Sequence, residues 1–153
     1  MFRVRGLNWY TKQMPQKLSR EDFLKSFKLA PRLAIELLFE NQKSELLLLK
    51  RDKEPFTGMW HLPGGFLLKD ESINDCIIRL AKDELNLVIN PKQTKRLGLF
   101  ETLNGDPRGH ILHHPVKVKI PSIVNKDYFR VIPKNTIPYQ ASFLEKLGYK
   151  LEK

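Results

Sequence analysis

The sequence predicts an α+β fold in which a mixed β-sheet lies between helices. Short apolar stretches suited to strands alternate with stretches of helical periodicity, and 153 residues suffice for one hydrophobic core. The run ELLLLK at 45–50 is apolar on both faces, which is typical of a strand covered by helices on each side. We therefore expect a single α/β/α sandwich domain spanning residues 1–153.

Six segments have the apolar pattern of strands: 32–40, 45–51, 60–62, 95–103, 109–120 and 128–132. The first two predict a hairpin around the polar turn 41–44. A turn at Pro63-Gly64-Gly65 follows the third strand, and Asn-Gly-Asp-Pro at 104–107 separates the fourth from the fifth.

Three segments predict helices. Residues 19–28 form a short capped helix within an N-terminal helical extension of about residues 1–30. The central helix begins at the N-cap Ser72, with Asp75 three residues later. An amphipathic helix at about 138–147 closes the chain.

Glu84 is an acidic residue on the apolar face of the central helix. At about 100° per residue, this face also holds Ile73, Cys76, Ile77, Leu80, Ala81 and Leu87. An unpaired carboxylate there is costly to bury, so Glu84 needs a partner. One hypothesis is a hard divalent cation, because Gly64 and Gly65 let main-chain oxygens approach a ligand closely. The alternative is a structural ion pair with a Lys or Arg from elsewhere in the chain.

Arg79 is not the expected partner of Glu84. It lies roughly 140° around the helix from that residue. It is better placed to bond Asp75 and Asp83, its neighbours one turn away on either side, and Glu71 is also within its reach.

The spacing G-x5-E-x7-R, followed by two acids, resembles the Nudix hydrolase box. Five residues of the segment 65–87 occupy its positions: Gly65, Glu71, Arg79, Asp83 and Glu84. The likeness extends over roughly residues 18–120 and is greatest to the GDP-mannose mannosyl hydrolase branch. It implies a Nudix-like fold and a Mg²⁺ or Mn²⁺ ion held by Gly64, Asp83 and Glu84. Gly65, Glu71 and Arg79 are then structural residues of the box.

The chain departs from the family pattern at several positions. Leu80 stands where most Nudix boxes have Glu. The GDP-mannose branch also has Leu at this position, and its enzymes attack the sugar carbon. Asp83 is shorter than the usual Glu, and Asn86 replaces a Gly but tolerates the left-handed C-cap geometry. The loop PSIVNKDYF at 121–129 lacks the Gln-His pair that serves that branch as ligand and base.

Arg51, Glu36 and Arg108 are the predicted substrate-binding residues. The Arg51 guanidinium can grip a diphosphate with two hydrogen bonds, and its match in the GDP-mannose branch faces the leaving diphosphate. Glu36 matches a nucleoside contact of that branch, or faces solvent. Arg108 belongs to DPRGH, which resembles a loop of ADP-ribose-type Nudix enzymes, or is a turn residue.

The histidines have weaker functional signals. His113 and His114 are adjacent in a strand, so their side chains point to opposite faces and at most one faces the site. His61, between Trp60 and Leu62, is expected to pack around the glycine turn.

The expected function is Mg²⁺- or Mn²⁺-dependent hydrolysis of a nucleoside diphosphate linked to another moiety, foremost a nucleotide sugar such as GDP-mannose. Glu84 and Arg51 are the expected catalytic residues, and water is the nucleophile. Two alternatives stay open: a pyrophosphatase of ADP-ribose or dinucleotides, and a Nudix-fold nucleotide-binding protein without turnover.

The composition limits the classes of ligand that we expect this chain to bind. The net charge of +10 suits a polyanionic ligand, but the basic residues are scattered and form no nucleic-acid-binding motif. The sequence has no apolar run long enough for a membrane span and no secretory signal pattern. The single cysteine, Cys76, lies on the apolar helix face. We therefore expect a cytoplasmic protein that binds a nucleoside diphosphate derivative, and a homodimer stays open.

Overall fold

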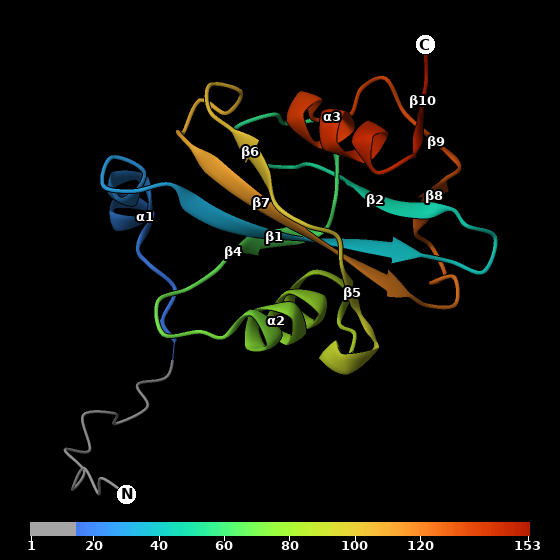
Figure 1. The fold of residues 1–153 in the computed structure, drawn as a ribbon, viewed down its shortest axis with the longest axis horizontal. Helices are drawn as coiled ribbons and strands as arrows, with labels where there is room; N and C mark the ends of the chain where they lie inside the picture. Colours follow the sequence, from blue (N-terminus) through green and yellow to red (C-terminus); the bar gives the residue numbers. More distant parts are fainter. Residues whose placement is uncertain (1–14) are drawn as a thin grey trace, which may run out of the picture.

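A mixed β-sheet lies between helices, as the sequence predicts (Figure 1). The computed structural model describes residues 15–153. Residues 1–14 of the predicted N-terminal extension lie outside the described residues. The first helix, α1 (Arg20–Ser26), begins after Ser19, whose side chain accepts a hydrogen bond from the Asp22 amide at 3.1 Å. The predicted capped helix is thus confirmed.

Eight strands form the main sheet: β1 (Arg32–Glu40), β2 (Leu46–Lys50), β3 (Trp60–His61), β4 (Gly64–Phe66), β5 (Lys95–Arg96), β6 (Phe100–Thr102), β7 (Ile111–Lys119) and β8 (Asp127–Phe129). Two further strands, β9 (Val131–Ile132) and β10 (Lys150–Leu151), form a small parallel pair. The remaining elements are α2 (Ile73–Leu85), a 3₁₀ turn (Pro91–Gln93) and α3 (Pro138–Lys146).

β1 is the central strand of the sheet, which has the order β3-β2-β1-β7-β5. It runs parallel to β7 along its whole length, from Arg32↔Ile111 to Glu40↔Lys119. On its other side it pairs antiparallel with β4 near its start and with β2 at its end. The sheet is therefore mixed.

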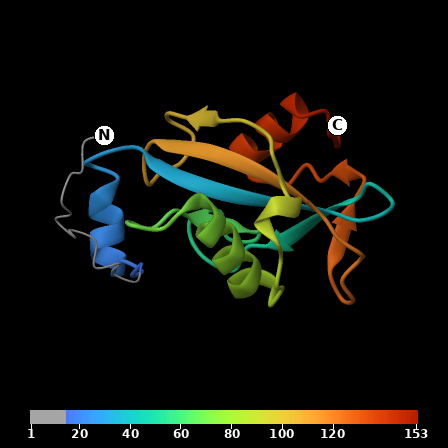
Figure 2. The same ribbon diagram turned by 60° about the horizontal axis from the view of Figure 1, so that its bottom comes forward.

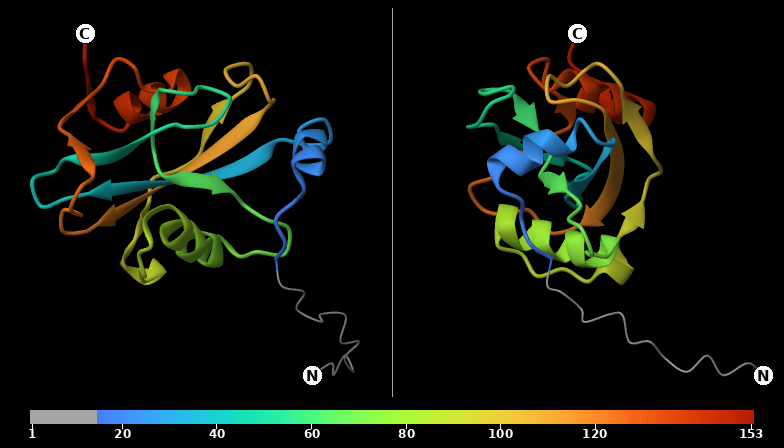
Figure 3. Two further views of the ribbon diagram at one scale, coloured as in Figure 1. Left: turned by 180° about the vertical axis from the view of Figure 1, so that it is seen from behind. Right: turned by 90° about the vertical axis from the view of Figure 1, so that its left-hand side faces the viewer.

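The two faces of the sheet are covered by different helices. α2 covers one face and α3 the other (Figures 2 and 3). Alternate residues of β1 pack against α2 and against α3, because successive side chains of a strand point to opposite faces of the sheet. Ile35 and Leu37 pack in the α2 layer with Cys76 and Ile77, whereas Leu38 packs in the α3 layer with Phe143.

Three aromatic rings attach α1 to the sheet. Phe23 of α1 and Phe27, the residue directly after this helix, both contact Phe66 of β4, with ring centroids 5.2 and 5.5 Å apart. Ala34 and Ile111 complete this small apolar cluster. α1 is therefore fixed beside the start of β1.

The predicted limits of the central helix are confirmed. Ser72 accepts a hydrogen bond from the Asp75 amide at 3.0 Å, and Asn86 ends the helix in the left-handed conformation with φ of 54°. Cys76 is fully buried, and burial, together with the nearby Glu71 carboxylate, raises the pKa of its thiol to about 12.

Several sequence predictions about strands are wrong. The expected glycine turn is instead the start of β4, because Gly64 pairs with Glu36 of β1. The two strands are so close that a Cβ on Gly64 would overlap the carbonyl oxygen of Ile35. The predicted strand 95–103 is interrupted at Gly98, where φ is 106°. The predicted strand 128–132 divides into β8 and β9, which belong to different sheets, and β10 was not predicted.

None of the helices within residues 15–153 is long and apolar enough to cross a membrane.

Candidate active site

A pocket of about 610 Å³ opens where β1 changes its neighbour. β1 pairs with β4 at residues 34–36 but with β2 at Glu40, so residues of β2 and β4 line the pocket between them. The residues that line the pocket form two groups, which we call the charged part and the aromatic part. The charged part contains Arg51, Asp52, Lys53 and Glu84, and the aromatic part contains Phe23, Phe66 and Arg108.

Glu84 reaches the charged part of the pocket from α2. Burial and the neighbouring Asp83 carboxylate raise its pKa above the ordinary value, and Lys53 and Arg51 offset this only in part. The Glu84 carboxylate is therefore short of positive charge, and a bound cation would supply it. This observation agrees with the metal hypothesis for Glu84.

The two glycines of β4 form the wall beside Glu84. Gly64 and Gly65 both line the pocket. A Cβ on Gly65 would lie 2.8 Å from a terminal carbon of Leu80, which is buried on α2. The missing side chains thus let β4 approach both β1 and α2 closely.

The residues present fit a hard divalent cation. Mg²⁺ is usually bound through one or two carboxylates, with water and phosphate oxygens in its other positions. Glu84 would supply a carboxylate and Gly64 a main-chain oxygen, since both residues line the pocket. Within residues 15–153, no group of three or more His, Cys, Asp or Glu side chains is arranged to hold a metal ion. Water and phosphate oxygens would complete the coordination of a cation held by these groups.

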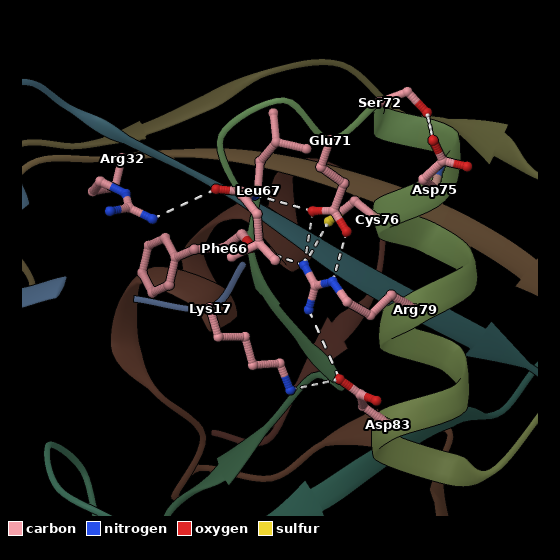
Figure 4. A network of polar contacts seen from close by, with 11 residues as sticks. Lys17, Arg32, Phe66, Leu67, Glu71, Ser72, Asp75, Cys76, Arg79 and Asp83 are labelled. Carbon is pink, nitrogen blue, oxygen red and sulfur yellow. Dashed lines mark hydrogen bonds and ion pairs between the residues drawn. The ribbon is translucent and has the colours of Figure 1, made fainter. Parts of the chain in front are cut away.

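Asp83, the third predicted metal ligand, does not line the pocket. Its carboxylate lies 2.9 Å from Nζ of Lys17 and 3.9 Å from Arg79 (Figure 4). A contact of Asp83 with a metal ion, through water, stays a prediction.

Arg79 and Glu71 connect the start of α2 to the end of β4. Two guanidinium nitrogens of Arg79 donate to the two oxygens of Glu71 at 2.6 and 2.9 Å, and one also donates to the Phe66 carbonyl (Figure 4). The prediction that Arg79 bonds Asp75 is wrong, because Asp75 accepts a hydrogen bond from Ser72 instead. Both Arg79 and Glu71 lie outside the pocket, where they support the Gly64–Phe66 strand.

Arg51 lies in the charged part of the pocket, and its contact with a diphosphate stays a prediction. Its guanidinium donates to the main-chain oxygens of Pro55 and Glu54 in the loop that follows β2. The loop closes on itself because the Gly58 amide donates to the Arg51 carbonyl at 2.8 Å. Arg51 is thus held by its own loop beside Glu84.

Glu36 is buried and does not face solvent. Its Oε1 lies 2.5 Å from Nδ1 of His113, whose Nε2 lies 2.9 Å from the Thr102 hydroxyl. Its Oε2 is buried and has no hydrogen-bond partner in the part of the chain that the structure describes. Burial raises the pKa of Glu36, although the bond to His113 works in the opposite direction. Both Glu36 and His113 line the pocket.

The remaining histidines are separated by the strand geometry. His114 points away from His113, as expected, and its Nδ1 lies 2.7 Å from the Gly98 carbonyl oxygen. His61 lines the pocket, so the prediction that it only packs around the turn is incomplete.

Arg108 lies in the aromatic part and is paired with Asp106. Two of its nitrogens donate to the two oxygens of Asp106 at 2.9 and 2.7 Å, and its guanidinium lies over the Phe66 ring at 5.4 Å. The hydroxyl of Tyr139, on α3, donates to the same carboxylate at 3.1 Å. Arg108 is thus a pocket residue, not only a turn residue.

Sequence reasoning missed several pocket residues: Phe23, Lys53, Phe66, Asp127, Tyr139 and Gln140. They come from α1, α3 and the ends of β2, β4 and β8. Nothing in their local sequence indicates a ligand, since they meet only after folding.

These features define a site suited to a phosphate ligand with a bound metal ion: a carboxylate on a helix, two glycines beside it and several basic residues in one pocket. The NUDIX domain profile matches residues 30–127, and the chain therefore belongs to the Nudix family.

Two curated relatives match part of the chain. An ADP-ribose pyrophosphatase from Methanocaldococcus jannaschii is 32% identical over 112 residues, which cover 72% of this chain and 64% of that protein. The low-salt glycan biosynthesis protein Agl8 from Haloferax volcanii is 34% identical over 71 residues, covering 46% of this chain and 44% of that protein. The match thus spans less than two thirds of either relative.

The fold has many solved neighbours. One is a bifunctional NMN adenylyltransferase/ADP ribose pyrophosphatase from Francisella tularensis, solved in complex with AMP and a Mn ion. It aligns with a TM-score of 0.60 at 19% identity, over 83% of this chain and 46% of that chain. These comparisons support the Nudix family but do not specifically support the GDP-mannose branch.

Proposed function

We propose that this chain is a divalent-metal-dependent hydrolase of a nucleoside diphosphate linked to a sugar, with ADP-ribose as the substrate to test first. The observation that carries this proposal is the shared pocket of Glu84, Arg51 and the aromatic part. A volume of about 610 Å³ is within the usual range of about 300–1,000 Å³ for small-molecule sites. Its charged part suits a diphosphate, and its aromatic part suits a base or a sugar.

The division of roles follows from these positions. Glu84 and the Gly64 main-chain oxygen would hold Mg²⁺ or Mn²⁺, with help from Asp83 through water. Such an ion, when bound, neutralises the oxygens of the diphosphate. Arg51 lies on the same side and would stabilise the charge that develops on the leaving phosphate. Water is the nucleophile.

Glu36 favours adenosine over guanosine in this pocket. Guanine presents two adjacent N–H donors, which both oxygens of one carboxylate can accept together. Here Oε1 of Glu36 already contacts Nδ1 of His113, and within residues 15–153 only Oε2 has no partner, so a base that offers one donor is the better match. The named ADP-ribose pyrophosphatase relative and the AMP-bound fold neighbour agree with this choice.

A nucleotide sugar attacked at carbon is the second candidate. It is favoured by Leu80, which is buried against Gly65 at the position where most Nudix boxes carry a Glu. The Agl8 relative, named as a glycan biosynthesis protein, is consistent with a sugar-linked substrate.

One experiment separates these functions. The protein is incubated in ¹⁸O-labelled water with ADP-ribose or GDP-mannose, with and without Mg²⁺ or Mn²⁺, and the products are analysed. We expect AMP and ribose 5-phosphate, formed only with metal, with the label on a phosphate. Labelled free mannose together with GDP would instead support the second candidate. A ligand-induced rise in Tm without any product would identify a binding protein and overturn the hydrolase proposal.

A further inference from the structure

Asp106 is a buried carboxylate that the proposed chemistry does not use. It lies in the turn between β6 and β7, and its side chain is fully buried. Four hydrogen bonds reach it. They come from Nε, Nη2 and the main-chain amide of Arg108, at 2.9, 2.7 and 2.9 Å, and from the Tyr139 hydroxyl at 3.1 Å.

These bonds keep Asp106 ionised. Burial alone would raise its pKa, but the hydrogen bonds and positive charge of Arg108 outweigh burial and hold the pKa below its ordinary value. Burial, Asp106 and their hydrogen bond raise the pKa of the Tyr139 hydroxyl, so it stays a donor. A buried charge is tolerated only with such partners, so Asp106 fixes the positions of both side chains.

Asp106 does not line the pocket, but both of its partners do. The guanidinium of Arg108 lies over Phe66. The Tyr139 ring stacks on His113 with centroids 4.9 Å apart, and His113 in turn contacts Glu36. One carboxylate thus holds two flat groups of the pocket, and one of them, Tyr139, stacks on the histidine that contacts Glu36.

The side chains next to Arg108 and Asp106 include residues outside the matched family segment. The NUDIX match ends at residue 127, whereas Tyr139 belongs to α3. Phe23, which contacts Phe66 from α1, precedes the match at residue 30. Phe23 and Tyr139 are therefore pocket residues that the family match does not include.

We propose that Asp106 is a positioning residue, which sets Arg108 and Tyr139 as the wall against which the nucleoside of the substrate lies. The proposal rests on the proposed function, in which the pocket takes a nucleoside diphosphate derivative. Guanidinium and aromatic faces stack on planar bases. The diphosphate is assigned to the other part of the pocket, near Arg51 and Glu84. Loss of Asp106 should therefore weaken the nucleoside contact and spare the phosphate contact.

The test compares two fragments that occupy different parts of the pocket. Binding of AMP and of inorganic pyrophosphate, each with Mg²⁺, is measured by calorimetry for the full chain and for Asp106→Asn. We expect AMP to bind about tenfold more weakly, as for the loss of a charge-assisted hydrogen bond, and pyrophosphate to bind within about twofold of the original affinity. In turnover, KM for ADP-ribose should rise while kcat changes little.

Two further variants keep the test decisive if Asp106→Asn does not fold. Tyr139→Phe removes only the hydroxyl, and Arg108→Gln removes the guanidinium. Both should weaken AMP selectively, whereas Asp75→Asn, an exposed aspartate at the start of α2, should leave both affinities unchanged. Equal losses for AMP and pyrophosphate would show a purely structural role. Unchanged AMP binding in the folded variants, or no AMP binding by the wild-type chain, would overturn the proposal.

The result for Asp106 can be distinguished from the result for the proposed hydrolase activity. Selective loss of AMP binding by a chain that hydrolyses no substrate would support the role of Asp106 and reject the hydrolase. Hydrolysis of ADP-ribose with unchanged KM in Asp106→Asn would support the hydrolase and reject the role of Asp106.

Discussion

Arg79 donates to both carboxylate oxygens of Glu71 across eight residues of sequence, at 2.6 and 2.9 Å. The Glu71 side chain is only 2% exposed, so this ion pair differs from the exposed pairs of the surface. Arg79 also holds the carbonyl of Phe66, at the end of β4. The pair therefore links the start of α2 to the strand that carries Gly64 and Gly65.

Glu71→Gln should destabilise the fold. The substitution removes a charge from a buried pair, and hydrogen bonds to charged groups contribute about 1.5–3 kcal/mol. We expect Tm to fall by several degrees at neutral pH, as measured by calorimetry. Glu21→Gln is the matched control, because its partner Lys25 lies at 2.6 Å but both side chains are largely exposed. An equal loss in the two variants would contradict this account.

The effect of Glu71→Gln should depend on pH. Burial alone would raise the pKa of Glu71, but the hydrogen bonds of Arg79 and Leu68 outweigh it and lower the pKa. A carboxyl whose pKa is lowered in the folded state stabilises the protein above its unfolded pKa of about 4.3. This stabilisation is lost as the pH falls through the lower, folded-state pKa. The difference in Tm between wild type and variant should therefore disappear in that acidic range.

Local signals explain which elements were predictable. α2 has an N-cap at Ser72, an apolar stripe and a left-handed end at Asn86, all within fifteen residues of sequence. β1 matches its prediction, Arg32–Glu40, because it is a continuous apolar run. β4 was missed because glycine has no side-chain pattern, and the strand exists only through its pairing with β1.

The site was less predictable because its groups meet across long stretches of chain. Glu84, Gly64 and Arg51 could be proposed from spacing and resemblance, and the structure brings all three to one pocket. The burial of Glu36 depends on His113, which is 77 residues away. The bond from Tyr139 to Asp106 likewise needs α3 to dock on the sheet, which no local pattern shows.

Gly64→Ala should be far more damaging than Gly65→Ala. A Cβ at position 64 would overlap the main-chain carbonyl of Ile35, which cannot move without breaking the β1–β4 pairing. A Cβ at position 65 would meet only the end of the Leu80 side chain, at 2.8 Å. We expect Gly64→Ala to prevent folding or lower Tm strongly, and Gly65→Ala to cost about 1–3 kcal/mol. Thermal unfolding of the two variants provides the measurement, and equal stabilities would refute the prediction.

Glu84→Gln should remove metal-dependent activity without unfolding the protein. Its raised pKa shows that the ionised form is disfavoured in the absence of a cation, so a neutral amide is easier to bury. We expect an unchanged or higher Tm, no further rise in Tm on addition of Mn²⁺, and loss of hydrolysis. Glu145→Gln, exposed on α3, is the control and should behave as wild type. A variant that keeps its metal response would exclude Glu84 as a ligand.

Arg51→Lys tests whether the diphosphate is held by the shape of a guanidinium or by charge alone. Lysine keeps the positive charge but loses the planar group that donates to Pro55 and Glu54 and is held beside Glu84. A charge-assisted hydrogen bond contributes roughly 1.5–3 kcal/mol, so kcat/KM or affinity should fall about ten- to hundredfold. Lys153→Ala, at the last residue of the sequence, is the control for net charge and should alter only the salt dependence of binding. Equally small effects of both substitutions would mean that the overall positive charge attracts the ligand, and Arg51 would then have no specific role in the pocket.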